Sequence, residues 1–346
     1  MTFDELVTTL VKTHQLFHRH TAQTADLSLV VRNWFFGYYI VEFEQAGKER
    51  ADYGSRQLTK LSERLKTVGI PGSSTTSLKY CRKFYQTYPK IGQAVTDQYP
   101  DRIPLTQLRQ KFRLGWTHYQ MLMSLSNPDE RSFYEIEAAD NQWSTRELKR
   151  QINTALFERL SLSRDQDEIK HLASQGQLLA SPRDAIKDPY ILEFLELEQR
   201  PTYSENDLET AIIDKLEHFL LELGKGFLFE SRQKRFSFDE EHFYVDLVFY
   251  NRLLRCYVLI DLKIGQLKHQ DLGQMQMYVN YFDRYVKTKD ENPTIGIVLC
   301  KRKKDALVEL TLPKNANIFA SQYQLYLPSK EELKRQLQEA ADEVEV

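Results

Sequence analysis

The sequence has only three cysteines, and no two of them form a C-x-x-C pair. This argues against a disulfide framework and a zinc knuckle, and it favours a reducing compartment. Net charge is only −2, so no general basic excess indicates nucleic acid, and any nucleic-acid surface must be local. No stretch approaches the roughly 18 apolar residues of a membrane span, and the N-terminus lacks the apolar region of a signal peptide. We therefore expect a cytoplasmic protein without membrane contact.

The length and composition are typical of a folded chain with two domains. At 346 residues the chain can bury two cores, and its 41% hydrophobic and 28% charged residues are ordinary for a globular protein. The patterning changes twice along the chain. We expect a helical domain at 1–160, a linker with one short helix at 161–205, and an α/β domain at 206–346.

The N-terminal part shows apolar residues at three- and four-residue spacings, the period of a helix. The segment LSLVVRNWFFGYYIVEFE is apolar nearly all round, so we expect a helix that is buried on most sides or that forms a protein interface. Ser144 and Glu147 form a capping box that begins another helix. No convincing strand precedes residue 200, and we expect PYILEFLELE to be the linker's short helix.

The C-terminal part combines helical and strand patterns. We expect one amphipathic helix over LETAIIDKLEHFLLELG, another around DLGQMQMYVNYFDRYV, and an exposed charged helix over the final SKEELKRQLQEAADEVEV. Strand patterns occur in FLFESRQKRF, HFYVDLVFY, CYVLIDLKI, TIGIVLC and near IFASQYQLYL. Together they predict an α/β domain in which helices flank a mixed sheet.

Two of these strands carry charges where burial is expected, at Asp246, Asp261 and Lys263. If residue 246 pairs with residue 261 in a hairpin, the turn is centred between Leu253 and Leu254, and both carboxylates share one face. Lys263 shares this face because it lies two residues after Asp261. Two carboxylates suit Mg²⁺, and a lysine beside the ion can orient an attacking water. An Asp–Lys ion pair at a strand end explains the same residues equally well.

Several neighbouring residues bear on this choice. Glu209 lies in the first turns of a predicted helix, where the helix dipole favours an acid in any case. Gln274 and Tyr278 are four residues apart on a helix, so they present one face that either meets substrate or packs. His242 and His269 flank the predicted site but lack metal-ligand spacing, and we interpret them as hydrogen-bonding bystanders.

The order of these residues resembles the PD-(D/E)XK nuclease superfamily: Glu209 on a helix, Asp246 on a strand, Asp261-Leu262-Lys263 on the next strand, then Gln274-x-x-x-Tyr278. The amino-acid sequence from GKGFLFESRQKRF to MYVNYFDR is similar to that of the YhcG family of nucleases, as is the segment YLPSKEEL. The segments WTHYQMLMSLSNPDERSFYEIEA and WSTRELKRQI resemble the helical N-terminal domain of that family. The resemblance covers most of the chain.

The resemblance implies a restriction-endonuclease-like C-terminal domain with a metal site. Asp246 and Asp261 match the two motif acids, which are expected to bind Mg²⁺ or Mn²⁺, and Lys263 matches the catalytic lysine. Glu209 matches the helix acid often found at the edge of such sites.

Two further features complete the comparison with the superfamily. Gln274 and Tyr278 match the Q-x-x-x-Y pattern of RecB-like members and are expected to contact substrate. Val245 stands where the motif's proline would precede the first acid, and Asp261 replaces the glutamate of the strictest form. Both are common variations, so the site is expected to be intact.

A locally basic segment lies in the predicted helical domain. The segment from residue 54 to residue 90 contains eight Lys or Arg residues and only one Glu. It consists of two predicted helices separated by GIPGSSTT. This layout resembles a helix-turn-helix, whose second helix would place Lys79, Arg82 and Lys83 against DNA. A solvated basic face of a helical bundle is the alternative. The run 301–304 is either a second phosphate contact or a soluble loop.

The leading hypothesis is a metal-dependent DNA endonuclease with Mg²⁺ or Mn²⁺ and no organic cofactor. It would act on branched, recombination or repair intermediates, or on foreign DNA, and the sequence does not choose among these. A homodimer is expected if both strands are cut. The alternatives are a DNA-binding protein on a catalytically idle nuclease fold and a protein-interaction module.

Overall fold

The computed structural model describes residues 1–18, 25–46, 54–89, 111–161, 166–197, 202–238, 240–313, 315–326 and 335. The charged helix expected over the last residues lies outside the described residues, apart from Arg335. Contacts divide the chain into two compact units, Met1–Lys149 and Arg150–Val346. Within the described parts, no helix combines the length and the apolar character that a membrane crossing requires.

Unit 1 is helical, as the sequence predicts. Its long helix α2 is buried on most sides, and Trp34, Phe35 and Phe36 are each at most 1% exposed. The helix α4 packs closely on α2, because Gly37 leaves room for the backbone carbonyl of Cys81. The helices are α1 (Phe3–His18), α2 (Ala25–Ala46), α3 (Gly54–Thr67), α4 (Thr75–Thr87), α7 (Trp116–Leu122), α8 (Pro128–Asp140) and α9 (Thr145–Asn153), which runs across the boundary between the units.

Unit 2 is built on a six-stranded mixed sheet with the order β1-β6-β5-β4-β3-β2. The strands are β1 (Tyr190–Ile191), β2 (Phe227–Phe238), β3 (Glu241–Asn251), β4 (Cys256–Gln266), β5 (Ile295–Arg302) and β6 (Ile318–Gln324). Strands β2, β3 and β4 pair antiparallel, and β4, β5, β6 and β1 pair parallel. The five strand patterns read from the sequence all form strands of this sheet.

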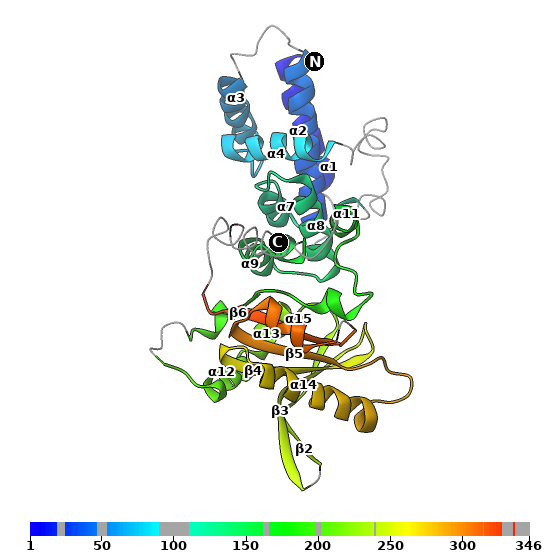
Figure 1. Cartoon of the computed structure of the whole chain (residues 1–346). Coiled ribbons are helices and arrows are strands. Elements are labelled where there is room, and N and C mark those ends of the chain that lie inside the picture. The colour runs from blue at the N-terminus through cyan, green and yellow to red at the C-terminus, as the bar shows by residue number, and fades with distance from the viewer. Residues whose placement is uncertain are drawn as a thin grey trace. The chain divides into compact units, whose positions relative to one another are not determined.

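Helices cover both faces of the sheet (Figure 1). One core joins the sheet to α12 (Glu205–Asp214) and α13 (Leu216–Leu223), and β4 contributes alternate residues to it, including Val258, Ile260 and Leu262. The other core joins the sheet to α14 (His269–Tyr281) and includes Leu259 of β4. The remaining elements are α10 (Leu156–Ser161), α11 (Gln166–Gln175), η5 (Pro182–Ala185), η6 (Glu193–Leu195), η7 (Phe282–Val286) and α15 (Asp305–Thr311).

Two expectations about secondary structure are wrong. PYILEFLELE does not form a helix, because Tyr190 and Ile191 pair with β6 as a buried parallel strand, so a strand does precede residue 200. The segment from Leu208 to Leu223 is two helices, since Lys215 leaves the helical region at φ −116° and ψ 30°. In the first case pairing with β6 outweighs the local helical pattern.

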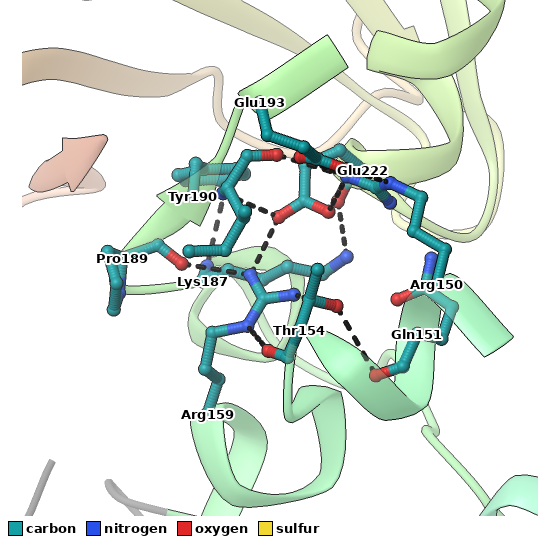
Figure 2. A network of polar contacts seen from close by, with 10 residues as sticks. Arg150, Gln151, Thr154, Arg159, Lys187, Pro189, Tyr190, Glu193 and Glu222 are labelled. Atoms are coloured by element: carbon teal, nitrogen blue, oxygen red, sulfur yellow. Dashed lines mark hydrogen bonds and ion pairs between the residues drawn. The ribbon is translucent and has the colours of Figure 1, made fainter. Parts of the chain in front are cut away.

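A buried ionic network holds the first part of unit 2 to helix α13. The carboxylate of Glu222 is fully buried and pairs with Arg159 at 2.6 Å and Arg150 at 3.2 Å (Figure 2). The same carboxylate accepts the backbone N–H of Ile191 at 3.0 Å, and Lys187 donates to the backbone carbonyl of Glu222. These contacts join the segment 150–191 to the helix that flanks the sheet.

Candidate active site

Strand β4 supplies the first two side chains of the candidate site. Asp261 is 3% exposed, and its Oδ2 lies 2.7 Å from Nζ of Lys263. The same ammonium lies 3.8 Å from Oε2 of Glu205, at the start of α12. Both β4 residues stand where alternation along the strand places them on one face, as the sequence predicts.

Asp246 comes from the neighbouring strand in the predicted register. Strands β3 and β4 pair from Asn251 with Cys256 to Leu247 with Ile260, so the hairpin prediction is confirmed and its turn falls at residues 252–255. Asp246 and Asp261 are the next residues in this register. There the Oδ2 of Asp246 accepts the backbone N–H of Leu262 at 2.8 Å. The carboxylate is therefore fixed against β4 where the ladder of backbone pairs between β3 and β4 ends.

Glu209 reaches the site from helix α12 through a residue that the sequence did not single out. Glu209 is 3% exposed, and its Oε1 lies 3.1 Å from Nε of Arg232. The side-chain amide of Gln233 donates to Glu209 and, at 3.1 Å, to Oδ1 of Asp246. Gln233 thus joins the two carboxylates. Its position opposite Asp246 in the hairpin was the only signal that could have identified it.

The carboxylates are close enough to affect one another's protonation. Burial, reinforced by the negative charge of Asp246 and opposed by Lys263, raises the pKa of Asp261 to about 7. Burial also raises the pKa of Glu209, where Asp246 again adds to the effect and Gln233 and Arg232 oppose it. Burial lowers the pKa of Lys263, but Asp261 and Glu205 outweigh it, so the net shift is upward. The site is an acidic cluster around one firmly protonated lysine.

Gln274 and Tyr278 form a hydrogen-bonded pair on α14, as their spacing suggests. The amide of Gln274 donates to the phenol oxygen of Tyr278, which is 1% exposed. Burial, with a contribution from the charge of Asp261, raises the pKa of Tyr278 to about 12. The phenol is therefore within electrostatic range of the carboxylates, and its ring also belongs to the core on the α14 side.

The donor set fits a hard divalent cation. Asp261 Oδ2 and Glu209 Oε1 are buried carboxylate oxygens that face cationic nitrogens, Lys263 Nζ at 2.7 Å and Arg232 Nε at 3.1 Å. No cluster of three metal-ligating His, Cys, Asp or Glu side chains occurs in the part of the chain that the structure describes. Mg²⁺ needs no such cluster, because it binds one or two carboxylates and completes its shell with water and phosphate oxygens.

The predicted DNA-contacting residues lie in unit 1, on helix α4. Its N-cap Ser74 accepts the N–H of Ser77, and the loop before α4 separates it from α3 as the sequence predicts. Lys79 and Lys83 are exposed, whereas Arg82 pairs with Glu44 of α2 at 3.0 Å. Of the basic run 301–304, Lys303 is occupied by ion pairs with Asp188 and Asp305.

Comparison with known proteins matches both parts of the chain to family models. A family model described as "YhcG PDDEXK nuclease domain" matches residues 183–338, and one described as "DUF1016 N-terminal domain" matches residues 9–159. The chain is 38% identical over 318 residues to "Putative nuclease YhcG" of Escherichia coli (strain K12). The aligned region covers 87% of this chain and 84% of that protein. A "crystal structure of a repair endonuclease from Pyrococcus abyssi" aligns over 37% of this chain and 50% of its own, at 18% identity and a TM-score of 0.25.

Proposed function

The chain belongs to the YhcG family of PD-(D/E)XK nucleases. We therefore propose that it is a metal-dependent DNA endonuclease, and that Asp246, Asp261 and Lys263 form the site that hydrolyses phosphodiester bonds of DNA. One observation carries this proposal. The ammonium of Lys263 lies 2.7 Å from the buried carboxylate of Asp261, and the carboxylate of Asp246 stands beside it on the next strand. An ion pair serving stability alone would not need a second acid, half-buried on the next strand, whose charge raises the pKa of the first.

Asp246 and Asp261 would hold Mg²⁺ or Mn²⁺, with Glu209 at the edge of the site. Each carboxylate oxygen has two lone pairs, so the hydrogen bonds that Asp246 already accepts leave room for a cation. A bound divalent cation supplies positive charge that polarises the scissile phosphate and lowers the pKa of water. The two hydrogen bonds from Gln233 and the backbone of Leu262 keep the carboxylate of Asp246 from rotating away.

Lys263 acts as a cation and not as a general base. Its carboxylate neighbours raise its pKa, so the side chain stays an ammonium at neutral pH. Held by Asp261 and Glu205, the ammonium can donate hydrogen bonds to an attacking water and to the phosphate oxygen that gains charge. Gln274, exposed on α14, would contact the substrate, whereas Tyr278, expected from the sequence to do the same, is 1% exposed and would act by holding the amide of Gln274.

The test is cleavage of labelled linear, nicked, forked and four-way DNAs with Mg²⁺ or Mn²⁺, by the native chain, Lys263→Ala and Lys289→Ala. Lys289 is an exposed lysine in the same unit, so its variant controls for loss of a positive charge. We expect metal-dependent products from the native chain and the control and none from Lys263→Ala. The preferred DNA would also distinguish branched intermediates from ordinary duplex. Binding without cleavage of any DNA would favour the catalytically idle fold instead.

We also propose that the chain acts as a homodimer when both strands are cut, since one site hydrolyses one strand at a time. Sedimentation analysis with and without DNA measures this directly. A monomer that nonetheless makes double-strand breaks in a single binding event would contradict the proposal.

A further inference from the structure

The outer halves of β2 and β3 form a two-stranded ribbon beyond the sheet. Strand β3 pairs with β4 only from Leu247 to Asn251, whereas its pairing with β2 continues to Glu241. Residues 241–246 therefore have β2 as their only paired neighbour in the described residues. Figure 1 shows this hairpin projecting from the sheet. We call residues 232–238 and 241–246 the β2–β3 ribbon.

One face of the β2–β3 ribbon is fixed by aromatic packing. Phe236 stacks on Tyr281 of α14 with ring centroids 4.1 Å apart and meets Tyr278 edge-on at 5.5 Å. Phe243, the cross-strand partner of Phe236, stacks against it at 5.5 Å. The ribbon is thus anchored to the same helix that carries Gln274 and Tyr278, so its opposite face is held in a defined position.

The opposite face carries polar side chains in line with the candidate active site. Arg235 pairs across the strands with Tyr244, and Ser237 pairs with His242. Because side chains alternate along a strand, these two pairs share a face with each other. The contact between Gln233 and Asp246 continues the same series by one step towards the site. The face therefore ends at a proposed metal-binding carboxylate.

Within the described residues, this face presents hydrogen-bond donors that form no ion pair with a carboxylate. Of the three cations on this part of β2, Arg232 pairs with Glu209 and Lys234 pairs with Glu230. Arg235 makes no ion pair in the described part of the chain, and its Nη2 lies 2.9 Å from His242 Nε2. Ser237 Oγ lies 2.9 Å from the same ring. A guanidinium, an imidazole and a hydroxyl gathered on an exposed face are the groups that contact phosphates.

We propose that this face of the β2–β3 ribbon is the track along which the phosphodiester backbone of one DNA strand reaches Asp246 and Asp261. The inference rests on the proposed function and adds where the substrate lies. At about 3.3 Å per residue, Arg235 and Ser237 stand roughly 7 Å and 13 Å along the strand from Gln233. The contacts would therefore fall within a few nucleotides of the scissile phosphate. Tyr244, 46% exposed beside Arg235, offers a ring to the sugars or bases of that strand.

The test compares Arg235→Ala with Arg252→Ala, in which an exposed arginine is removed from the turn at the other end of β3. Binding of fluorescein-labelled DNA is measured by fluorescence anisotropy in a buffer that contains Ca²⁺, while the salt concentration is varied from about 50 to 200 mM. A plot of the logarithm of the binding constant against the logarithm of the salt concentration has a negative slope. Loss of one phosphate contact should make this slope shallower by about 0.7 to 0.9 and weaken binding about threefold to tenfold. Arg252→Ala should match the native chain, and both variants should melt like it.

The outcomes separate this inference from the nuclease proposal when cleavage is scored on the same preparations. If the native chain cleaves DNA but Arg235→Ala keeps the native salt slope, the track is wrong and the nuclease stands. If the slope falls for Arg235→Ala although no protein cleaves, the track stands and the nuclease proposal fails. If Arg235→Ala changes the sedimentation coefficient and leaves the slope unchanged, the ribbon is a protein interface and the track is overturned. If the native chain binds no DNA, both proposals fail.

Discussion

The side-chain amide of Gln233 donates a hydrogen bond to Asp246 at 3.1 Å, and the same nitrogen donates to Glu209. Gln233 has a φ of 45°, in the left-handed region that costs a residue with a Cβ about 1–2 kcal/mol. The chain retains this strained conformation where one amide joins two acids that would otherwise repel each other. Gln233 is therefore a positioning residue for the carboxylates of the proposed metal site.

Replacing Gln233 separates its backbone strain from its side-chain role. Gln233→Gly and Gln233→Ala both remove the amide, but only glycine relieves the backbone strain. In urea denaturation we therefore expect Gln233→Gly to be more stable than Gln233→Ala by about 1 kcal/mol. Both should bind Mn²⁺ about 10- to 100-fold more weakly, the usual effect of losing a group that orients a metal ligand. Calorimetric titration with Mn²⁺ measures this. Native affinity in both variants would show that the amide does not position the acids.

The hairpin register and the face shared by its acids could be predicted from the sequence, because strand alternation is strict. Pairing residue 246 with residue 261 required only a turn centred between Leu253 and Leu254, and the observed ladder has that register. The helical nature of unit 1 followed from apolar spacing in the same way. Gln274 and Tyr278 also meet as expected, since residues four apart on a helix are neighbours.

The features that escaped prediction depend on contacts distant in sequence. Gln233 looks like any polar strand residue until its left-handed backbone turns its amide towards Glu209. Ile191 has a helical local context, but pairing with β6 and a hydrogen bond to Glu222 make it a strand. Lys215 interrupts a continuous helical pattern at a point that the apolar periodicity does not mark.

Neutralising Glu222 should destabilise unit 2 strongly. In Glu222→Gln the fully buried guanidinium of Arg159 loses its counter-charge, and breaking such a pair costs about 3–5 kcal/mol. Glu193→Gln is the control, because Glu193 pairs with the same Arg150 but is 22% exposed, and its loss should cost about 1 kcal/mol or less. Urea denaturation compares the two. Equal losses of unfolding free energy in the two variants would mean that burial of Glu222 does not make its ion pairs more important for stability.

The stability due to Glu222 should also depend on pH in a defined direction. Burial alone would raise the pKa of Glu222, but Arg159, Lys187 and Arg150 outweigh it and hold the pKa at about 2. Since this lies below the ordinary glutamate value of 4.5, the stabilisation is complete above about pH 4.5 and is lost as the pH falls towards 2. The native chain should therefore lose more stability than Glu222→Gln over this window. Parallel curves from pH 5 to pH 2 would contradict the assignment.

Gly37 should tolerate no side chain, because helices α2 and α4 touch there. A Cβ at Gly37 would lie 2.0 Å from the backbone oxygen of Cys81 and 2.9 Å from Cβ of Tyr85, so α4 would have to move. We expect Gly37→Ala to cost about 3 kcal/mol or more of unfolding free energy. Gly273→Ala, in open space within α14, should instead gain about 0.5–1 kcal/mol. Thermal melting of both variants tests the contact, and a native melting temperature for Gly37→Ala would exclude it.

The proposed DNA contacts of helix α4 should not be equivalent. Lys79 and Lys83 are exposed, so each alanine variant should reduce the salt slope of DNA binding by about 0.7 to 0.9 if the residue neutralises a phosphate. Arg82 is already paired with Glu44, so Arg82→Ala should have a smaller effect. Glu44→Gln should then strengthen binding, because it frees the guanidinium and removes a negative charge. Anisotropy titrations over a range of salt compare all four variants. If none of them changes the slope, the basic face of α4 is only solvated and DNA is bound elsewhere, with the β2–β3 ribbon as the remaining candidate.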